Sequence, residues 1–93
     1  MIDVKITRYI NMSQVNKELG TSLRDYEFLQ EVANDSYVPL WLDDETVEDL
    51  DENIRWEEGK DIRRYKRLQH DLALVNLLRA QGFRDTILVY VSW

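Results

Sequence analysis

The chain has 93 residues, a net charge of −6 and no cysteine, with 44% hydrophobic and 32% charged residues. This composition predicts a single folded domain, residues 1–93, and excludes a disordered chain and a disulfide-stapled one. The negative charge excludes an unaided nucleic-acid binder, which gains affinity by neutralising phosphates. MIDVKITRYI lacks a signal-peptide pattern and no apolar run approaches ~20 residues, so we expect a cytoplasmic protein that does not cross a membrane.

The N-terminal segment predicts a strand and a short helix. Hydrophobic and polar residues alternate over residues 1–10, which is typical of a half-buried strand. Asn11 or Ser13 can then cap a short helix. Gly20 is expected to end it, because glycine adopts the left-handed conformation at little cost.

A second helix and an extended segment are predicted next. Thr21 or Ser22 can begin the helix, which runs to about Ala33. Its buried stripe would comprise Leu23, Tyr26, Leu29 and Val32, with Phe28 beside Leu29. Residues 37–42 are expected to be extended, as a connector or an edge strand, because Pro39 cannot donate a ladder hydrogen bond.

Two further helices are predicted between residues 43 and 82. Asp43 or Asp44 caps the first, and Glu57-Glu58-Gly59 is the expected break after it, with a kinked continuous helix as the alternative. The second, Lys60–Gln81, becomes apolar nearly all round after His70 and is therefore the expected centre of the core. The apolar positions of the first are Val47, Leu50 and Ile54, and the stripe of the second is Ile62, Tyr65, Leu68, Leu72, Val75 and Leu78.

The C-terminal segment, residues 83–93, is predicted to be a strand. Ile87, Val89, Val91 and Trp93 share one face, yet Leu88 and Tyr90 make the other face apolar too. We therefore expect cover on both faces, or a partner chain beside the strand. The predicted fold class is α+β: the N- and C-terminal strands pair as a small antiparallel sheet with three to four helices between them.

The strongest charge feature is an acidic block from Asp43 to Glu58. It contains nine acids and one base, for a net charge of −8, which leaves +2 for the remaining 77 residues. Such a block is either a solvated helix face or a surface that binds a basic partner. The predicted partner-binding residues are Asp43, Asp44, Glu45, Glu48, Asp49, Asp51, Glu52, Arg55 and Trp56.

In composition this acidic block resembles the nucleic-acid-mimicking inhibitors with which phages and mobile elements block restriction or CRISPR nucleases. That resemblance implies a non-enzymatic inhibitor or regulator. Its carboxylates would occupy the basic nucleic-acid-binding site of a larger protein. Within the block, Arg55-Trp56 is the expected contact point, since Trp and Arg are frequent at interface hot spots.

A basic run follows the acidic block at residues 60–67. In isolation it indicates a site for an acidic or phosphate-bearing partner. It is also placed to pair within the chain. An antiparallel helix pair would lay Arg63, Arg64 or Arg67 beside acids of the preceding helix, namely Glu48, Asp51, Glu52 or Glu57.

Catalytic and metal-binding signatures are not found in the sequence. Asp49-Leu-Asp51 begins like a calcium loop, but Ile54 stands where the loop needs glycine. His70 and Asp71 are adjacent on a helix and diverge by ~100°, so they do not form a catalytic pair. We expect no enzyme activity and no cofactor. The alternative function is a structural or assembly subunit that self-associates through the C-terminal strand and the Trp41 segment, with a homodimer through the strand edge as one form, and whose acidic face only keeps it soluble.

Overall fold

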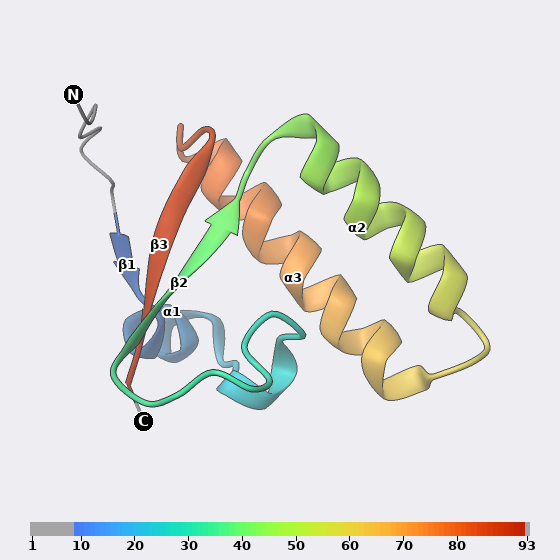
Figure 1. Cartoon of the computed structure of the whole chain (residues 1–93), viewed down its shortest axis with the longest axis horizontal. Helices are drawn as coiled ribbons and strands as arrows, with labels where there is room; N and C mark the ends of the chain where they lie inside the picture. The colour runs from blue at the N-terminus through green and yellow to red at the C-terminus, as the bar shows by residue number, and fades with distance from the viewer. Residues whose placement is uncertain (1–8, 93) are drawn as a thin grey trace.

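The computed structural model describes residues 9–92, which form a three-stranded sheet, three α-helices and one 3₁₀ turn (Figure 1). The α+β class is thereby confirmed. The predicted strand over residues 1–10 falls largely outside the described residues, as does Trp93. In chain order the elements are β1 (Tyr9–Asn11), α1 (Met12–Leu19), the 3₁₀ turn (Leu23–Asp25), β2 (Ser36–Trp41), α2 (Asp44–Glu57), α3 (Ile62–Ala80) and β3 (Thr86–Val91).

The sheet has the order β1-β3-β2, with β3 in the middle. The N- and C-terminal strands pair as predicted, but they run parallel, with Ile10 opposite Val89. The antiparallel partner of β3 is instead β2, which the sequence had left as a connector or edge strand. The hairpin formed by α2 and α3 returns the chain to the end of β2, so β3 must run back along β2. Pro39 lies on this edge strand, where a missing N–H is tolerated.

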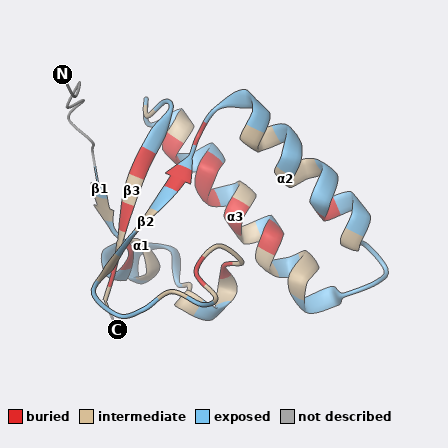
Figure 2. Ribbon diagram, viewed as in Figure 1, coloured by how far each residue is buried: buried red, intermediate tan, exposed pale blue. Residues whose placement is uncertain are grey.

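One face of the sheet forms the core with the C-terminal half of α3 (Figure 2). Along β3 burial alternates with period two, as the strand pleat requires. The central cluster is fully or nearly fully buried, and comprises Met12, Leu40, Leu74, Val75, Leu78, Ile87, Val89 and Val91. The other face of β3 is less covered than the sequence predicted, since Leu88 and Tyr90 remain half-exposed.

The caps of α1 confirm its predicted ends. The Asn11 side chain accepts a hydrogen bond from the Ser13 N–H at 2.9 Å. Gly20 follows the helix in the left-handed conformation, with φ of 68°, and its N–H donates to the Asn16 carbonyl.

The helix predicted from residue 21 or 22 to Ala33 is wrong. Only the 3₁₀ turn Leu23–Asp25 forms, closed by the Ser22 N–H donating to the Asp25 carboxylate at 2.8 Å. A tertiary contact prevents its continuation: the N–H groups of Glu27 and Phe28 donate to the carboxylate of Asp71 on α3, at 2.9 and 3.2 Å. Tyr26 and Leu29 still reach the core, as predicted.

Helices α2 and α3 form an antiparallel pair beside the sheet (Figure 1). Asp61 caps α3 by accepting from the Arg63 and Arg64 N–H groups, so the helix begins two residues later than predicted. Ile62 is therefore exposed at the first turn instead of joining the stripe. The C-terminal half of α3 is not buried on all sides, since Ala73, Asn76 and Leu77 are exposed, but α3 does form the centre of the core as predicted.

Gly59 makes the turn between α2 and α3, with φ of 78°, and a Cβ placed there would meet no atom within 4 Å. The cost of Gly59→Ala is therefore the backbone conformation alone, about 1 kcal/mol. We expect the melting temperature to fall by roughly 4–8 °C. The melting temperature of Gly59→Asn should fall less than that of Gly59→Ala in the same thermal unfolding experiment, because asparagine tolerates the left-handed conformation better than alanine does. Equal melting temperatures for all three proteins would contradict the prediction.

Candidate partner-binding surface

The acidic helix α2 divides into a face that packs and a face that points away from the fold. Ile54 is buried, and Val47 and Leu50 pack against the core, as their spacing predicted. On the opposite side lie four exposed carboxylates spaced by three, one and three residues, so that they line one side of the helix. We call these residues the acidic stripe: Glu45, Glu48, Asp49 and Glu52.

The acidic stripe forms no ion pair within residues 9–92. Figure 2 shows the outward side of α2 as largely exposed. Seven residue steps separate the first carboxylate from the last, which corresponds to about 10.5 Å along the axis, with rises of about 4.5, 1.5 and 4.5 Å between successive charges. The stripe is thus a dense row of charge that nothing in the described chain neutralises.

The first two predicted site residues hold α2 in place. Asp43 caps the helix by accepting hydrogen bonds from the backbone N–H and the hydroxyl of Thr46. The Thr46 hydroxyl is also the main reason that the pKa of Asp43 lies below its usual value. Asp44 forms an ion pair with Arg79 of α3, at 2.5 Å. Both carboxylates therefore anchor the N-terminus of α2, and both also add to its negative charge.

Asp51 and Arg55 lie on the flank of α2 and pair with each other at 3.2 Å. Both side chains are well exposed, and a pair of this kind on a helix adds only ~0.3–0.5 kcal/mol. Either side chain is therefore released at little cost when a partner approaches. They do not point along the acidic stripe, but they lie next to it.

Trp56 ends the acidic stripe one helical turn beyond Glu52. It is 67% exposed, and Trp41 on β2 is 54% exposed. The Lys60 ammonium group lies 3.3 Å from the ring centroid, a cation–π contact that fixes the ring across the turn at Gly59. The ring also borders an open hollow with Glu52, Asn53 and Arg55.

The basic run of α3 pairs within the chain, but mostly with an acid that the sequence analysis missed. Arg64 binds Glu57 of α2 at 2.6 Å, as predicted, and Glu27 at 2.9 Å. Arg67 binds Glu27 at 3.2 Å. The predicted pairs with Glu48, Asp51 and Glu52 are not formed, because these acids point away from α3 or to its side. The part of the acidic block left without a cation is therefore larger than predicted.

Asp71 is a second residue that the sequence analysis missed. It is the one charged side chain among the fully buried residues of the described chain. Burial raises its pKa to about 7, and the N–H donors of Glu27 and Phe28 oppose a larger increase. The sequence feature that could have indicated its burial is its position among Leu68, Leu72 and Leu74, within the most apolar part of the helix.

The histidine and the clustered acids do not form a metal site within the described residues. His70 Nδ1 lies 2.8 Å from the Lys66 carbonyl, and its ring contacts Tyr26 edge-on, so the imidazole is engaged in the helix. In residues 9–92 no group of three or more His, Cys, Asp or Glu could hold a metal ion. Nor does any helix in that range have the length and apolar character to cross a membrane.

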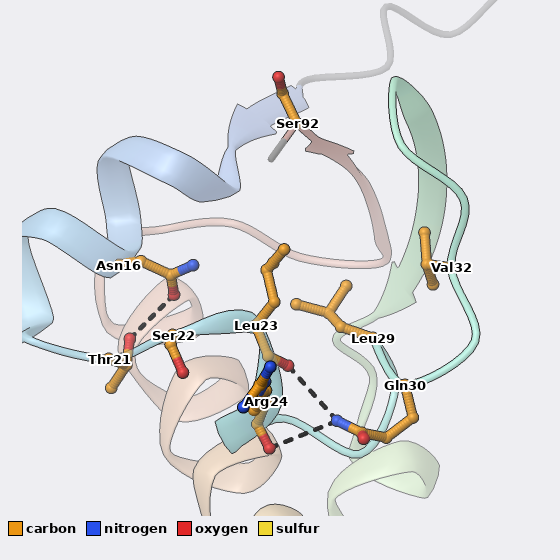
Figure 3. Close-up of a pocket in the computed structure, with 9 residues that line it drawn as sticks. All are labelled: Asn16, Thr21, Ser22, Leu23, Arg24, Leu29, Gln30, Val32 and Ser92. Carbon is orange, nitrogen blue, oxygen red and sulfur yellow. Dashed lines mark hydrogen bonds between the residues drawn. The ribbon is translucent and has the colours of Figure 1, made fainter.

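A hollow of about 680 Å³ lies between α1, the 3₁₀ turn and the end of β3 (Figure 3). Leu23, Leu29 and Val32 supply its apolar side. Its polar side chains are largely paired already: Thr21 donates to Asn16 at 2.9 Å, and Gln30 donates to the backbone carbonyl of Tyr26 at 2.6 Å. With these groups engaged inside the chain, the hollow is a weaker candidate than α2.

Together these features define a small α+β protein with a mixed sheet and an outward-facing acidic helix. The sequence matches no family model, no curated protein and no solved structure. Its function must therefore be argued from the surface of the protein alone.

Proposed function

We propose that the protein is a non-enzymatic inhibitor or regulator whose acidic stripe binds the basic nucleic-acid-binding site of a larger protein. The observation that carries the proposal is the position of the stripe. Four carboxylates face away from α3, and no cation in residues 9–92 forms an ion pair with them. Cations of a partner can meet these carboxylates without first breaking a contact of the fold.

The charge density of the stripe supports mimicry of a phosphate backbone. Its carboxylates have a mean rise of about 3.5 Å along the helix axis, although the individual rises are about 4.5, 1.5 and 4.5 Å; one strand of B-DNA carries one phosphate per ~3.4 Å. A cluster of Lys and Arg that neutralises a phosphate strand would therefore meet a similar density of negative charge on α2. Oppositely charged surfaces also associate rapidly, and their association weakens with added salt.

Trp56 and Arg55 add a contact that a purely electrostatic surface lacks. The exposed ring stands at one end of the stripe, held by Lys60, and can enter an apolar site of the partner. A short row of charges with an aromatic anchor at one end also defines the direction in which the helix lies on its target.

The class of partner follows from this chemistry. It is a larger protein with a basic groove, such as a restriction or CRISPR nuclease, and the protein would act in the manner of phage or mobile-element counter-defence. Direct binding to nucleic acid is not part of the proposal, because the stripe would repel phosphates. The absence of cysteine fits a reducing, cytoplasmic setting, and the mode of action needs no cofactor.

The test is displacement of DNA from a panel of purified restriction and CRISPR nucleases, followed by the anisotropy of a fluorescent duplex of about 20 base pairs. The wild-type protein should displace the duplex from at least one nuclease. Glu48→Lys with Glu52→Lys should raise the concentration required by roughly 10-fold or more. Raising salt from about 50 to about 200 mM should weaken the wild type more than this variant.

The matched control reverses two exposed acids elsewhere, Glu18→Lys with Glu31→Lys, and changes the net charge equally. It should retain nearly the full potency of the wild type. Equal losses in both double variants would show that total charge matters and the stripe does not. A wild-type protein that displaces DNA from no member of the panel would also contradict the proposal.

A further inference from the structure

The outward face of the sheet presents a group of aromatic and apolar side chains. We define the outer sheet face by Tyr9, Tyr37, Pro39, Trp41, Leu88 and Tyr90, which alternate with the buried positions of the strands and are placed side by side by the strand register. Three of the rings contact one another: Tyr9 meets Tyr37 edge-on at 6.2 Å, and Tyr37 lies 5.0 Å from Tyr90. They form a continuous surface.

The rings of this face are open to solvent. Tyr9, Tyr37 and Trp41 are 65%, 57% and 54% exposed. An aromatic side chain can bury ~150–250 Å², so these three alone present about 350 Å². The helices cover only the opposite face of the sheet (Figures 1 and 2). A patch of this size matches the largest apolar patch of a typical monomeric protein, and such patches often have a function.

The outer sheet face carries no charge at any described outward strand position. The two remaining outward strand positions, Asn11 and Thr86, are polar and neutral, and Asp35 at the rim accepts a hydrogen bond from the Tyr90 hydroxyl at 2.7 Å. This is informative in a chain with a net charge of −6. Two copies of an acidic chain repel each other where their carboxylates come close. Contact between two outer sheet faces does not bring carboxylates of the outward strand positions together. The same lack of charge disfavours single-stranded nucleic acid, which needs cations beside the stacking rings.

We infer that the outer sheet face binds a second copy of this chain, sheet against sheet. An uncharged, ring-covered surface is complementary to itself, as a two-fold interface requires. Two copies would bury about 700 Å² from the three rings alone, before Pro39, Leu88 and Tyr90 contribute. The interface therefore lies at or below the ~1,200 Å² lower limit of standard-size complexes, so we expect a weak dimer with a dissociation constant on the order of micromolar or above.

The arrangement differs from pairing through a strand edge. Pro39 lies in the middle of the β2 edge and cannot donate to an added strand, and β1 offers an edge of only three residues. Stacking of sheet faces needs neither edge. It also leaves the acidic stripe free, because the stripe lies on the side of α2 opposite to Val47, Leu50 and Ile54, which pack inward. The inference therefore goes beyond the proposed function and does not depend on it.

The experiment is sedimentation velocity over roughly 1 to 500 µM, a range that spans the expected constant. The wild type should shift from monomer to dimer. Trp41→Ser should weaken dimerisation by roughly 10-fold or more, and Tyr37→Ser should do the same. The matched control is Trp56→Ser, the same substitution at a tryptophan that is 67% exposed on α2, which should dimerise like the wild type. Circular dichroism and thermal unfolding establish that each variant is folded.

Three outcomes would overturn the inference. The first is a monomer at every concentration. The second is an equal loss of association in Trp41→Ser and Trp56→Ser, which would place the contact elsewhere. The third is binding of a fluorescent oligothymidine that Trp41→Ser abolishes, since the face would then serve single-stranded nucleic acid. DNA displacement by the proposed inhibitor is measured separately, so a failure of either proposal leaves the other intact.

Discussion

Raising the pH from about 5 to about 8 is expected to lower the free energy of unfolding through Asp71 by about 2.5 kcal/mol. The pKa of Asp71 is about 7 in the fold, against ~3.9 in an unfolded chain. Between these values the folded state holds more protons than the unfolded state, so stability must fall as the pH rises. The contribution is complete below about pH 4, is lost as the pH passes 7, and totals roughly 4 kcal/mol.

The measurement is urea denaturation of the wild type and Asp71→Asn at both pH values. Other carboxylates also titrate, but they do so in both proteins. The difference in stability between the two proteins therefore isolates Asp71. As the pH rises from about 5 to about 8, we expect the free energy of unfolding of the wild type to fall by about 2.5 kcal/mol relative to that of Asp71→Asn. A constant difference would show that Asp71 is ionised throughout, which means that the Glu27 and Phe28 N–H donors outweigh its burial.

Shortening Leu74 should have a large effect on stability. Leu74 is 1% exposed on the side of α3 that faces the sheet, and Leu74→Ala leaves a cavity there. Such substitutions cost about 3–4 kcal/mol. A domain of this size is stable by only about 5–14 kcal/mol. The melting temperature should accordingly fall by roughly 15–25 °C.

Leu77→Ala is the matched control for Leu74→Ala, since it makes the same change three residues later on the same helix. Leu77 is 37% exposed, so its removal leaves no sealed cavity and should cost no more than about 1 kcal/mol. The two free energies of unfolding, measured by urea denaturation, should differ by at least about 2 kcal/mol. If they are equal, Leu74 does not lie at the centre of the core.

Local chemistry was sufficient to predict α1, α2 and α3. Asn11, Asp43 and Gly59 mark helix ends within one or two residues of where the structure has them, because caps and left-handed turns act over a few residues. The helix predicted after Ser22 does not form, because the N–H groups of Glu27 and Phe28 donate to Asp71, more than forty residues later in the chain. No pattern within the segment announces that contact.

The parallel direction of β1 relative to β3 could not be predicted from the sequence either. Alternation identifies a strand, but which strand it joins, and in which sense, depends on the path of the chain between them. For the candidate surface, the outward position of the acidic stripe followed from Val47, Leu50 and Ile54, which fix the inward side. The engagement of Asp44 by Arg79 did not follow, because the two lie thirty-five residues apart.

The central place of β3 has a consequence for how the chain folds. β3 comes after both strands that flank it, so neither β1 nor β2 has a partner until β3 has been synthesised. The α2–α3 hairpin needs only local contacts and is available earlier. Folding therefore ends with the sheet, through contacts of long sequence separation, which close slowly. Until then the apolar edges of β1 and β2 are unprotected, and aggregation competes with folding during that interval.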